Sequence, residues 1–171
     1  MKILIDSRQL EQRIGELARE IAAAYPRSPP LFVGILNGAA QFMMALIGHL
    51  PEKILERLEY DFVDVSSYQG KESTGQVQLT KDLSAKVAGR DILLVDGIID
   101  TGRSLDFVRS MLEDRCPLSL KVCTLLNKST RREFAVQVDY CGFEIEDLFV
   151  VGYGMDYDQR YRALRHVAVI E

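Results

Sequence analysis

The sequence predicts an α/β protein built on a parallel sheet. Three short apolar runs, 31–36, 92–95 and 120–126, have the length and composition of strands that are buried on both faces. Segments with helical spacing of apolar residues lie between them, and this alternation is typical of parallel strands joined by helices. At 171 residues the chain fits a single domain, 1–171, that is long enough to bury a sizeable core.

The composition excludes several classes of protein. A hydrophobic fraction of 47% with 27% charged residues is typical of soluble globular proteins. The net charge of −4 argues against a nucleic-acid partner held by general electrostatics. No apolar run reaches the roughly 18 residues of a membrane helix, and no signal-peptide pattern is present, so we expect a cytoplasmic protein without a membrane partner. Cys116, Cys123 and Cys141 match no CxxC spacing and are interpreted as reduced thiols.

The first elements are a helix and a strand with a small-residue turn. Ser7 is predicted to cap a helix over 10–21, in which apolar residues recur at steps of three and four. The strand at 31–36 is followed by Asn37 and Gly38, and then by another helical pattern. Gly38 would let the backbone approach a ligand closely, although an ordinary turn explains the same residues equally well.

A polar loop follows the next strand. Apolar and charged residues alternate over 58–62, which predicts a strand with one wet face. The run 66–75 is rich in Ser and Gly, and an apolar–polar pattern resumes at Val77 and Leu79. We therefore predict a long hairpin with a mobile loop that closes over a site, and the alternative is a surface loop without a function.

The stretch 91–105 carries the strongest signal for a site. The buried run 92–95 leads into Asp96 and Asp100, and then into 101–104, whose sequence is TGRS, before a helical pattern begins. The N-terminus of a helix binds anions because its first N–H groups lack partners and its dipole favours negative charge. An ordinary turn with helix caps is the alternative, but capping needs only one of the two acids, whereas phosphate and cation chemistry uses both.

Polar residues also follow the later strands. Lys128 comes after the strand at 120–126, a further strand is expected at 136–140, and Asp156 follows a short strand at 148–151. Ligands of parallel sheets bind outside the carboxyl ends of the strands. We therefore expect Lys128 and Asp156 to gather with Asn37, Gly38 and the 96–104 stretch at one edge of the sheet.

Several of these stretches together resemble one family. Residues 95–105, VDGIIDTGRSL, resemble the phosphoribosyl-pyrophosphate signature of the type I phosphoribosyltransferases, whose usual form is VEDIIDTG. Residues 36–38, LNG, are similar to the pyrophosphate loop of the hypoxanthine-guanine branch, usually LKG. Residues 61–70, DFVDVSSYQG, resemble the flexible catalytic loop of that branch. Three further segments resemble the base-recognition half of that branch: LLNK at 125–128, DYCGFE at 139–144 and FVVGYGMDY at 149–157.

The resemblance implies a parallel-sheet core with helices on both faces, a small hood and a flexible hairpin loop. It also implies purine salvage by a glycosyltransferase that moves the 5-phosphoribosyl group from phosphoribosyl pyrophosphate to N9 of hypoxanthine or guanine, giving IMP or GMP. Mg²⁺ would be required, and the enzyme would be a homodimer or homotetramer.

The same resemblance assigns roles to individual residues. Asp100 would be the catalytic acid or base near purine N7, and Lys128 would donate to the exocyclic oxygen of the purine and so reject adenine. The resemblance implies that the 5′-phosphate is bound by Thr101, Gly102, Arg103 and Ser104, and the ribose by Asp96. Pyrophosphate would be bound by Asn37, Gly38 and Arg162, and Mg²⁺ by Asp96 and Asp156. The purine ring would be held by Ile98, Phe149 and the main chain of Val150, and the loop residues Ser67 and Tyr68 would exclude water.

Three positions depart from the usual family pattern. Gly97 stands where the second acid of the signature is expected, Asp96 is one methylene shorter than the usual Glu, and Asn37 replaces the Lys of the pyrophosphate loop. Losing the acid at 97 is expected to weaken metal-assisted sugar binding. The departures leave open a non-catalytic nucleotide sensor on the same fold. A xanthine-preferring enzyme is also open, because Lys128 does not settle the group at purine C2.

Overall fold

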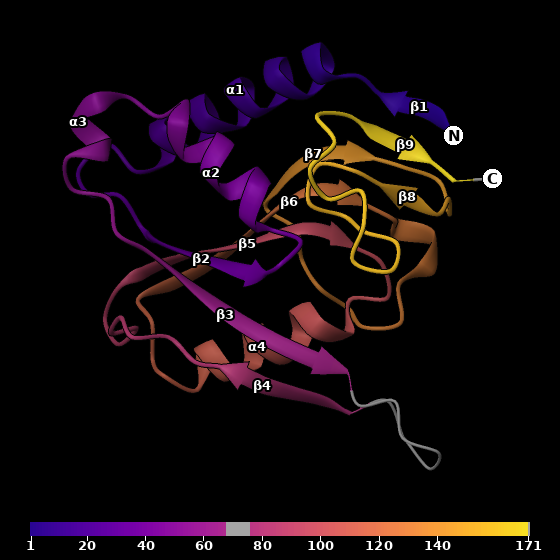
Figure 1. The fold of residues 1–171 in the computed structure, drawn as a ribbon. Helices are drawn as coiled ribbons and strands as arrows, with labels where there is room; N and C mark the ends of the chain where they lie inside the picture. The colour runs from indigo at the N-terminus through magenta and orange to yellow at the C-terminus, as the bar shows by residue number, and fades with distance from the viewer. Residues whose placement is uncertain (68–75, 171) are drawn as a thin grey trace.

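The computed structural model describes residues 1–67 and 76–170, except for the side chain of Ser67. Its centre is a six-stranded sheet with the order β4-β3-β2-β5-β6-β7 (Figure 1). Only β4 runs antiparallel to its neighbour. The strands are β2 (Leu31–Leu36), β3 (Tyr60–Ser67), β4 (Val77–Lys81), β5 (Asp91–Ile99), β6 (Ser119–Asn127) and β7 (Tyr140–Glu144).

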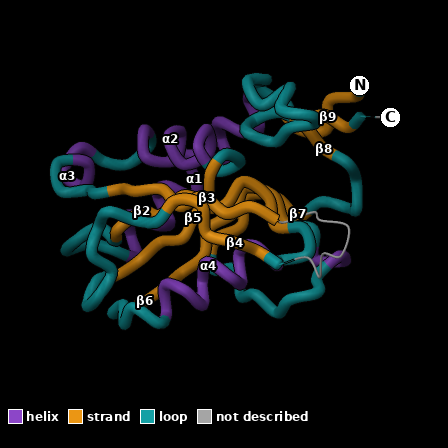
Figure 2. Tube along the Cα trace, turned by 60° about the horizontal axis from the view of Figure 1, so that its bottom comes forward, coloured by secondary structure: helices purple, strands orange, loops and turns teal. Residues whose placement is uncertain are grey.

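Helices cover both faces of this sheet, as Figures 1 and 2 show from two directions. On one face lie α1 (Ser7–Ala24) and α2 (Ala40–Gly48), which is followed by the short α3 (Glu52–Leu55), and on the other lies α4 (Arg103–Glu113). Phe32 packs on the α1 and α2 side, whereas its neighbours Leu31 and Val33 pack on the α4 side. Because successive side chains of a strand point to opposite faces, a strand between two helical layers needs the continuous apolar run seen at 31–36.

A second, three-stranded antiparallel sheet with the order β1-β9-β8 lies beside the larger one. It consists of β1 (Lys2–Ile5), β8 (Val150–Val151) and β9 (Val167–Val169), so both ends of the described chain meet in it (Figure 1). The predicted small hood and the helices on both faces are confirmed. No helix in the described ranges has the length and apolar character needed to cross a membrane.

Three local predictions differ from the structure. The N-cap of α1 is Asp6, whose carboxylate accepts hydrogen bonds from the N–H groups of Arg8 and Gln9, so Ser7 is the first helical residue. The N–H of Asp6 in turn donates a hydrogen bond to the side-chain oxygen of Gln9, which completes a capping box. The strand expected at 136–140 begins only at Tyr140, because Asp139 turns its carboxylate onto the N–H of Val122 at 2.8 Å.

The third difference bears on the site. β5 does not end at Val95 but continues to Ile99, so Asp96 and Gly97 belong to the strand. Residues 61–67 of the stretch that resembles the catalytic loop form most of β3. The predicted mobile loop of 66–75, including Tyr68, falls almost entirely outside the described residues.

Candidate active site

Two neighbouring cavities, each of about 230 Å³, open at the carboxyl edge of the large sheet. They share the lining residues Gly38, Ile98 and Asp100. The first cavity is also lined by Asp96 and by Thr101, Gly102, Arg103 and Ser104. The second is also lined by Lys128, Phe149, Val150, Met155, Asp156 and Arg162. The structure therefore brings together most of the candidate residues, and Asp100 lies where the two cavities meet.

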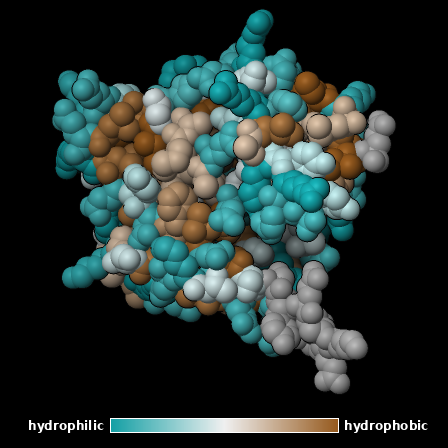
Figure 3. All heavy atoms as spheres, in the orientation of Figure 1, coloured by the Kyte–Doolittle hydropathy of each residue, from teal (hydrophilic) through white to brown (hydrophobic). Residues whose placement is uncertain are grey.

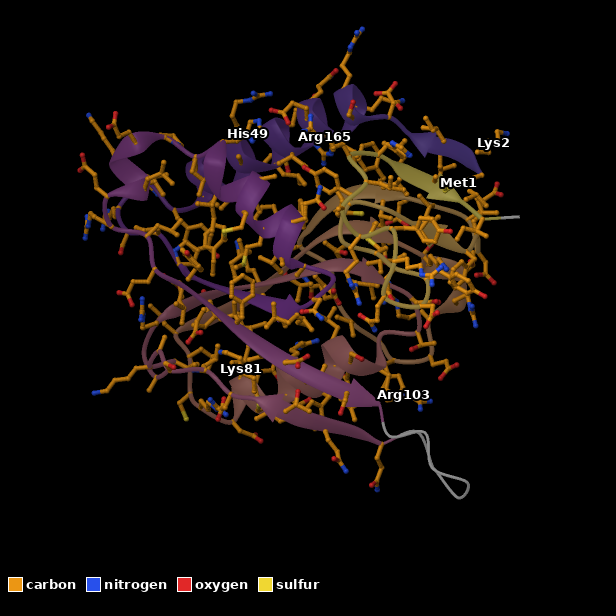
Figure 4. The ribbon with its side chains drawn as sticks, viewed as in Figure 1. Met1, Lys2, His49, Lys81, Arg103 and Arg165 are labelled. Carbon is orange, nitrogen blue, oxygen red and sulfur yellow. The ribbon has the colours of Figure 1, made fainter. Side chains whose placement is uncertain are left out.

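The turn before α4 has the form of an anion site. Gly102 is the N-cap of α4 with φ of 87°, and it supplies no side-chain oxygen to the first-turn N–H groups. The hydroxyl of Thr101 accepts a hydrogen bond from the N–H of Arg103 at 3.3 Å. The first turn of a helix without a side-chain cap favours an anion through its N–H groups and its dipole. Figure 4 shows Arg103 at this end of α4, close to the carboxyl end of β3.

A neighbouring segment supports this turn from behind. The carbonyl oxygen of Thr101 accepts hydrogen bonds from the N–H groups of Glu133 and Phe134 at 3.0 and 3.1 Å. A Cβ at Gly102 would lie 3.2 Å from side-chain atoms of Arg132, and Arg132 in turn donates to the side-chain oxygen of Asn127. The conformation of the turn thus depends on the 127–134 segment as well as on its own residues.

The side chain of Asp96 is half-buried. It lines the first cavity, and its Oδ1 accepts a hydrogen bond from the N–H of Gly97 at 2.7 Å. Burial raises the pKa of Asp96 to about 7, although hydrogen bonds from the main chain of Gly97 and Ile98 act in the opposite direction. A cation that arrives with the ligand would stabilise the ionised form of this carboxyl group, which burial disfavours.

Asp100 and Lys128 form the charged centre of the second cavity. Nζ of Lys128 lies 3.5 Å from Oδ2 of Asp100, and only 4% of Lys128 is exposed. Oδ1 of Asp100 lies 3.4 Å from Nε of Arg131, and it is shielded from solvent without a hydrogen-bond donor among the described residues. Asp147 completes the group, at 3.6 Å from Nζ of Lys128 and 3.4 Å from Nη1 of Arg131.

Apolar side chains form the walls of the same cavity. Phe149 is 54% exposed, and its ring makes an edge-to-face contact with Tyr157 at 5.7 Å between ring centres. Ile98 and Val150 line the cavity with it. Exposure of the Phe149 ring to water is unfavourable, and a flat aromatic ligand that stacks on the ring would remove this exposure.

Asp156 and Arg162 occupy the rim of the second cavity as an ion pair with a distance of 3.0 Å. Nη1 of Arg162 also donates to the carbonyl oxygen of Gly154 at 2.7 Å. Asn37 differs from the other candidates: it is exposed and lines neither cavity. Of the two loop candidates, Tyr68 and the side chain of Ser67 lie outside the described residues.

Sequence reasoning missed Arg131, Arg132 and Asp147. The two arginines follow Lys128 closely, and Asp147 precedes Phe149 by two residues. A charged residue close in sequence to a candidate is therefore the signal that could have identified them. The metal candidates Asp96 and Asp156 line the first and the second cavity, respectively. Within the described part of the chain, no group of three or more His, Cys, Asp or Glu side chains is placed to hold a metal ion.

Comparisons with known proteins agree with this architecture. The family model described as a phosphoribosyl transferase domain matches residues 2–158. The hypoxanthine-guanine phosphoribosyltransferase of Bacillus subtilis is 41% identical over 171 residues, which cover 99% of this chain and 93% of that protein. A bifunctional protein TilS/HprT of Listeria innocua is 44% identical over 99% of this chain but only 26% of its own length, so the chain spans about a quarter of that relative.

A solved structure gives the same result. The crystal structure of a hypoxanthine-guanine phosphoribosyltransferase from Bacillus anthracis, which holds a HEPES molecule in its active site, superimposes with a TM-score of 0.92 at 34% identity. The match covers all of this chain and 99% of that one. The fold and the similarity over the full chain agree, and the chain belongs to the hypoxanthine-guanine phosphoribosyltransferases of the type I phosphoribosyltransferase family.

Proposed function

We propose that this chain transfers the 5-phosphoribosyl group of phosphoribosyl pyrophosphate to N9 of hypoxanthine or guanine and releases pyrophosphate, as a step of purine salvage. The observation that carries the proposal is the position of Asp100 on the border of the two cavities. The sugar would occupy the first cavity, which is lined by Thr101 to Ser104, and the base would occupy the second cavity, which is lined by Lys128. The bond between them would then form beside Asp100.

On the base side, Asp100 is suited to take or return the proton of the purine ring. The ring becomes more acidic at N7 as the glycosidic bond forms, and a carboxylate within hydrogen-bond distance can accept that proton. The shielded Oδ1 of Asp100 has no donor of its own in the described residues, which supports this role. Lys128 has only hydrogen-bond donors, so it would bind the exocyclic oxygen of hypoxanthine or guanine and disfavour the amino group of adenine.

The ring itself would lie between Ile98 and Phe149, with its edge at the main chain of Val150. These three residues line one cavity, and the exposed ring of Phe149 gives a stacking surface.

On the sugar side, the residues from Thr101 to Ser104 would hold the 5′-phosphate at the start of α4. Gly38 and Arg162 would bind the pyrophosphate, and the guanidinium would stabilise its charge as it leaves. Asn37, the third pyrophosphate candidate, would contribute through its main chain, since its side chain lines neither cavity.

The acids of the site fit Mg²⁺ that arrives with its substrate. Mg²⁺ is usually held by one or two carboxylates together with substrate phosphates, rather than by a cage made only of protein. Asp96 and Asp156 line adjoining cavities, each together with Asp100, and the raised pKa of Asp96 favours a cation beside it. When bound, the metal would neutralise pyrophosphate charge; the residues of this chain orient the sugar and the base and move the proton.

We also propose that the chain forms a homodimer or homotetramer. Met44 on α2 and Leu55 on α3 are 39% and 38% exposed, and apolar side chains gather over this part of the surface in Figure 3. Exposed apolar side chains that lie together are typical of contacts between subunits. Light scattering at several protein concentrations tests this expectation, and a mass equal to one chain at all of them would contradict it.

The activity is tested by incubation with phosphoribosyl pyrophosphate, Mg²⁺ and a panel of hypoxanthine, guanine, xanthine and adenine. We expect IMP and GMP, with no AMP above background. If xanthine gives the fastest transfer, the base preference is wrong but the reaction class stands. If nucleotides bind while no base gives a product at saturating substrates, the chain is a nucleotide sensor instead, as the departures at Asn37 and Gly97 would allow.

A further inference from the structure

The carbonyl group of Gly38 lies in a narrow space between two other glycines, Gly97 and Gly154. A Cβ at Gly97 would be 2.5 Å from the carbonyl oxygen and 2.9 Å from the carbonyl carbon of Gly38, and a Cβ at Gly154 would be closer still to that oxygen. Real Cβ atoms essentially never come within 3.0 Å of a main-chain atom, so a side chain at either position requires the backbone to move. We call this pair of residues, Gly97 and Gly154, the glycine slot.

Backbone conformation does not explain the glycine at 97. Gly97 lies in β5, and it is not among the glycines with positive φ, so any residue could adopt its backbone. Gly38 itself has nothing within 4 Å of the place where its own Cβ would be. The absence of a side chain at 97 therefore matters because of what faces it.

The peptide between Gly38 and Ala39 is fixed at both of its polar groups. Its carbonyl lies in the glycine slot, and its N–H donates to the carbonyl oxygen of Ile35 at 3.0 Å. A peptide group is planar, so fixing both ends fixes the orientation of the whole turn that follows β2. This is the turn whose main chain is proposed to bind pyrophosphate.

The slot also joins three separate parts of the site. Gly97 follows Asp96 directly on β5, and Gly38 belongs to the turn after β2. Gly154 exchanges hydrogen bonds with Arg162: its N–H donates to the carbonyl oxygen of Arg162 at 2.9 Å, and its own carbonyl accepts from the guanidinium at 2.7 Å. A shift of the Gly38 carbonyl would therefore also displace Asp96 and Arg162.

We propose that the glycine slot positions the pyrophosphate turn, and that Gly97 is required there for space. This inference rests on the proposed function, because it assigns the turn to pyrophosphate. It changes the meaning of the departure at 97: an acid placed there would supply a carboxylate but would also push the Gly38 carbonyl aside. Gly97→Asp should therefore weaken, and not restore, the binding of the sugar pyrophosphate.

The test compares Gly97→Ala and Gly97→Asp with the wild type and with Gly48→Ala. Gly48 ends α2, and a Cβ there meets nothing within 4 Å, so it is a matched glycine control. We measure kcat and KM for phosphoribosyl pyrophosphate and for hypoxanthine in the forward reaction, KM for pyrophosphate in the reverse reaction, and the unfolding temperature.

We expect Gly97→Ala to raise KM for phosphoribosyl pyrophosphate and for pyrophosphate by about tenfold or more, which corresponds to a modest overpacking cost. KM for hypoxanthine should stay within about twofold, since a Cβ at Gly97 would meet the main chain of Gly38 and Ala39 and neither Lys128 nor Phe149. Gly97→Asp should be no better than Gly97→Ala, and Gly48→Ala should match the wild type.

Three kinetic results would overturn the proposal. They are unchanged KM values in Gly97→Ala, an equal rise of KM for hypoxanthine and for the sugar, and a lower KM for the sugar in Gly97→Asp than in the wild type. A Gly97→Ala protein that does not fold would also count against it, because only the turn is expected to move. If the wild type itself makes no IMP, the proposed function fails instead, and calorimetric binding of pyrophosphate to the same variants then tests the slot.

Discussion

Nζ of Lys128 lies 3.5 Å from Oδ2 of Asp100, so the residue proposed to recognise the purine and the residue proposed to move its proton form one ion pair. Lys128 is almost fully buried, whereas the Asp100 side chain is 41% exposed toward the cavities. A buried amine without a partner is costly, so each charge holds the other in place before a base arrives. The base is then recognised and reacts at one preorganised pair.

Replacing Asp100 by Asn should remove proton transfer while it preserves the size of the side chain. We expect kcat to fall by a factor of about 10² to 10⁴, the usual contribution of general acid–base catalysis, with little change in KM for the sugar pyrophosphate. Steady-state kinetics of IMP formation measure both values. Asp114→Asn, at the exposed other end of α4, is the control. A kcat within a few-fold of the wild type would refute the acid–base role of Asp100.

Lys128→Gln should weaken the selection of the base. An amide can accept as well as donate a hydrogen bond, so the preference for an exocyclic oxygen over an amino group should narrow. Loss of a hydrogen bond from a charged group lowers kcat/KM for hypoxanthine by about 10- to 100-fold. Lys121→Gln provides a matched control on β6, the strand that ends just before Lys128, since Lys121 packs near the rings of Tyr25 and Tyr140 instead. Equal losses for both variants would show that the effect is not specific to the base.

Asp147→Asn should have a smaller effect through Lys128. Asp147 is the second carboxylate near Nζ of Lys128, at 3.6 Å, but its side chain is 53% exposed. Exposed ion pairs contribute little, so we expect KM for hypoxanthine to rise by only about two- to fivefold, with kcat and KM for the sugar unchanged. A change in KM for the sugar, measured in the same assay, would mean that Asp147 acts on the site as a whole.

Much of the fold follows from local patterns, because a parallel sheet between two helical layers imposes a strong signal. The run 31–36 must be apolar on both faces, and this is what makes β2 recognisable. The same reliance on apolar residues places the predicted end of β5 too early, at Val95. Asp96 and Gly97 break the apolar pattern, yet the strand continues to pair with β6, and Asp96 lies opposite Thr124. Pairing of the backbone does not depend on the side chain being apolar.

The site was less predictable where it depends on contacts between distant segments. Sequence patterns identified Asp100 and Lys128, because each follows a recognisable strand. The ion pairs of Arg131 and Asp147, and the contact of Gly38 with Gly97, join segments that are far apart in the chain. Only the packing of the loops decides such contacts, and no local periodicity records it.

Asp61→Asn should reduce stability rather than activity. Oδ2 of Asp61 accepts hydrogen bonds from the N–H groups of Ser84 and Ala85 at 2.7 and 3.0 Å, and Oδ1 lies 3.5 Å from Nζ of Lys81. Burial alone would raise the pKa of Asp61, but the main-chain donors and Lys81 together lower it. Asn retains one acceptor and loses the charge, so unfolding in denaturant should show a loss of about 1–3 kcal/mol.

The sign of the pH dependence follows from the lowered pKa of Asp61. The wild type has this stabilisation above the ordinary pKa of an aspartate, and it loses it as the pH falls through the lower pKa of the folded state. The difference between the wild type and Asp61→Asn should therefore shrink in acid. Asp64→Asn, on the same strand, should show a smaller difference at neutral pH, and an equal one would contradict the assignment.

Asp96 should give the opposite pH dependence, because burial raises its pKa to about 7. Below that pH the carboxyl group is protonated and cannot bind a cation, so KM for the magnesium complex of phosphoribosyl pyrophosphate should rise by about tenfold for each pH unit. Asp96→Asn should have a high KM that varies little with pH.

Without ligands, Asp96 of the folded protein holds a proton that the unfolded chain releases, so this group lowers stability as the pH rises from about 4 to about 7. The unfolding temperature of Asp96→Asn relative to the wild type should therefore be more favourable at about pH 8 than at about pH 5. The reverse order would show that folding does not raise the pKa of Asp96.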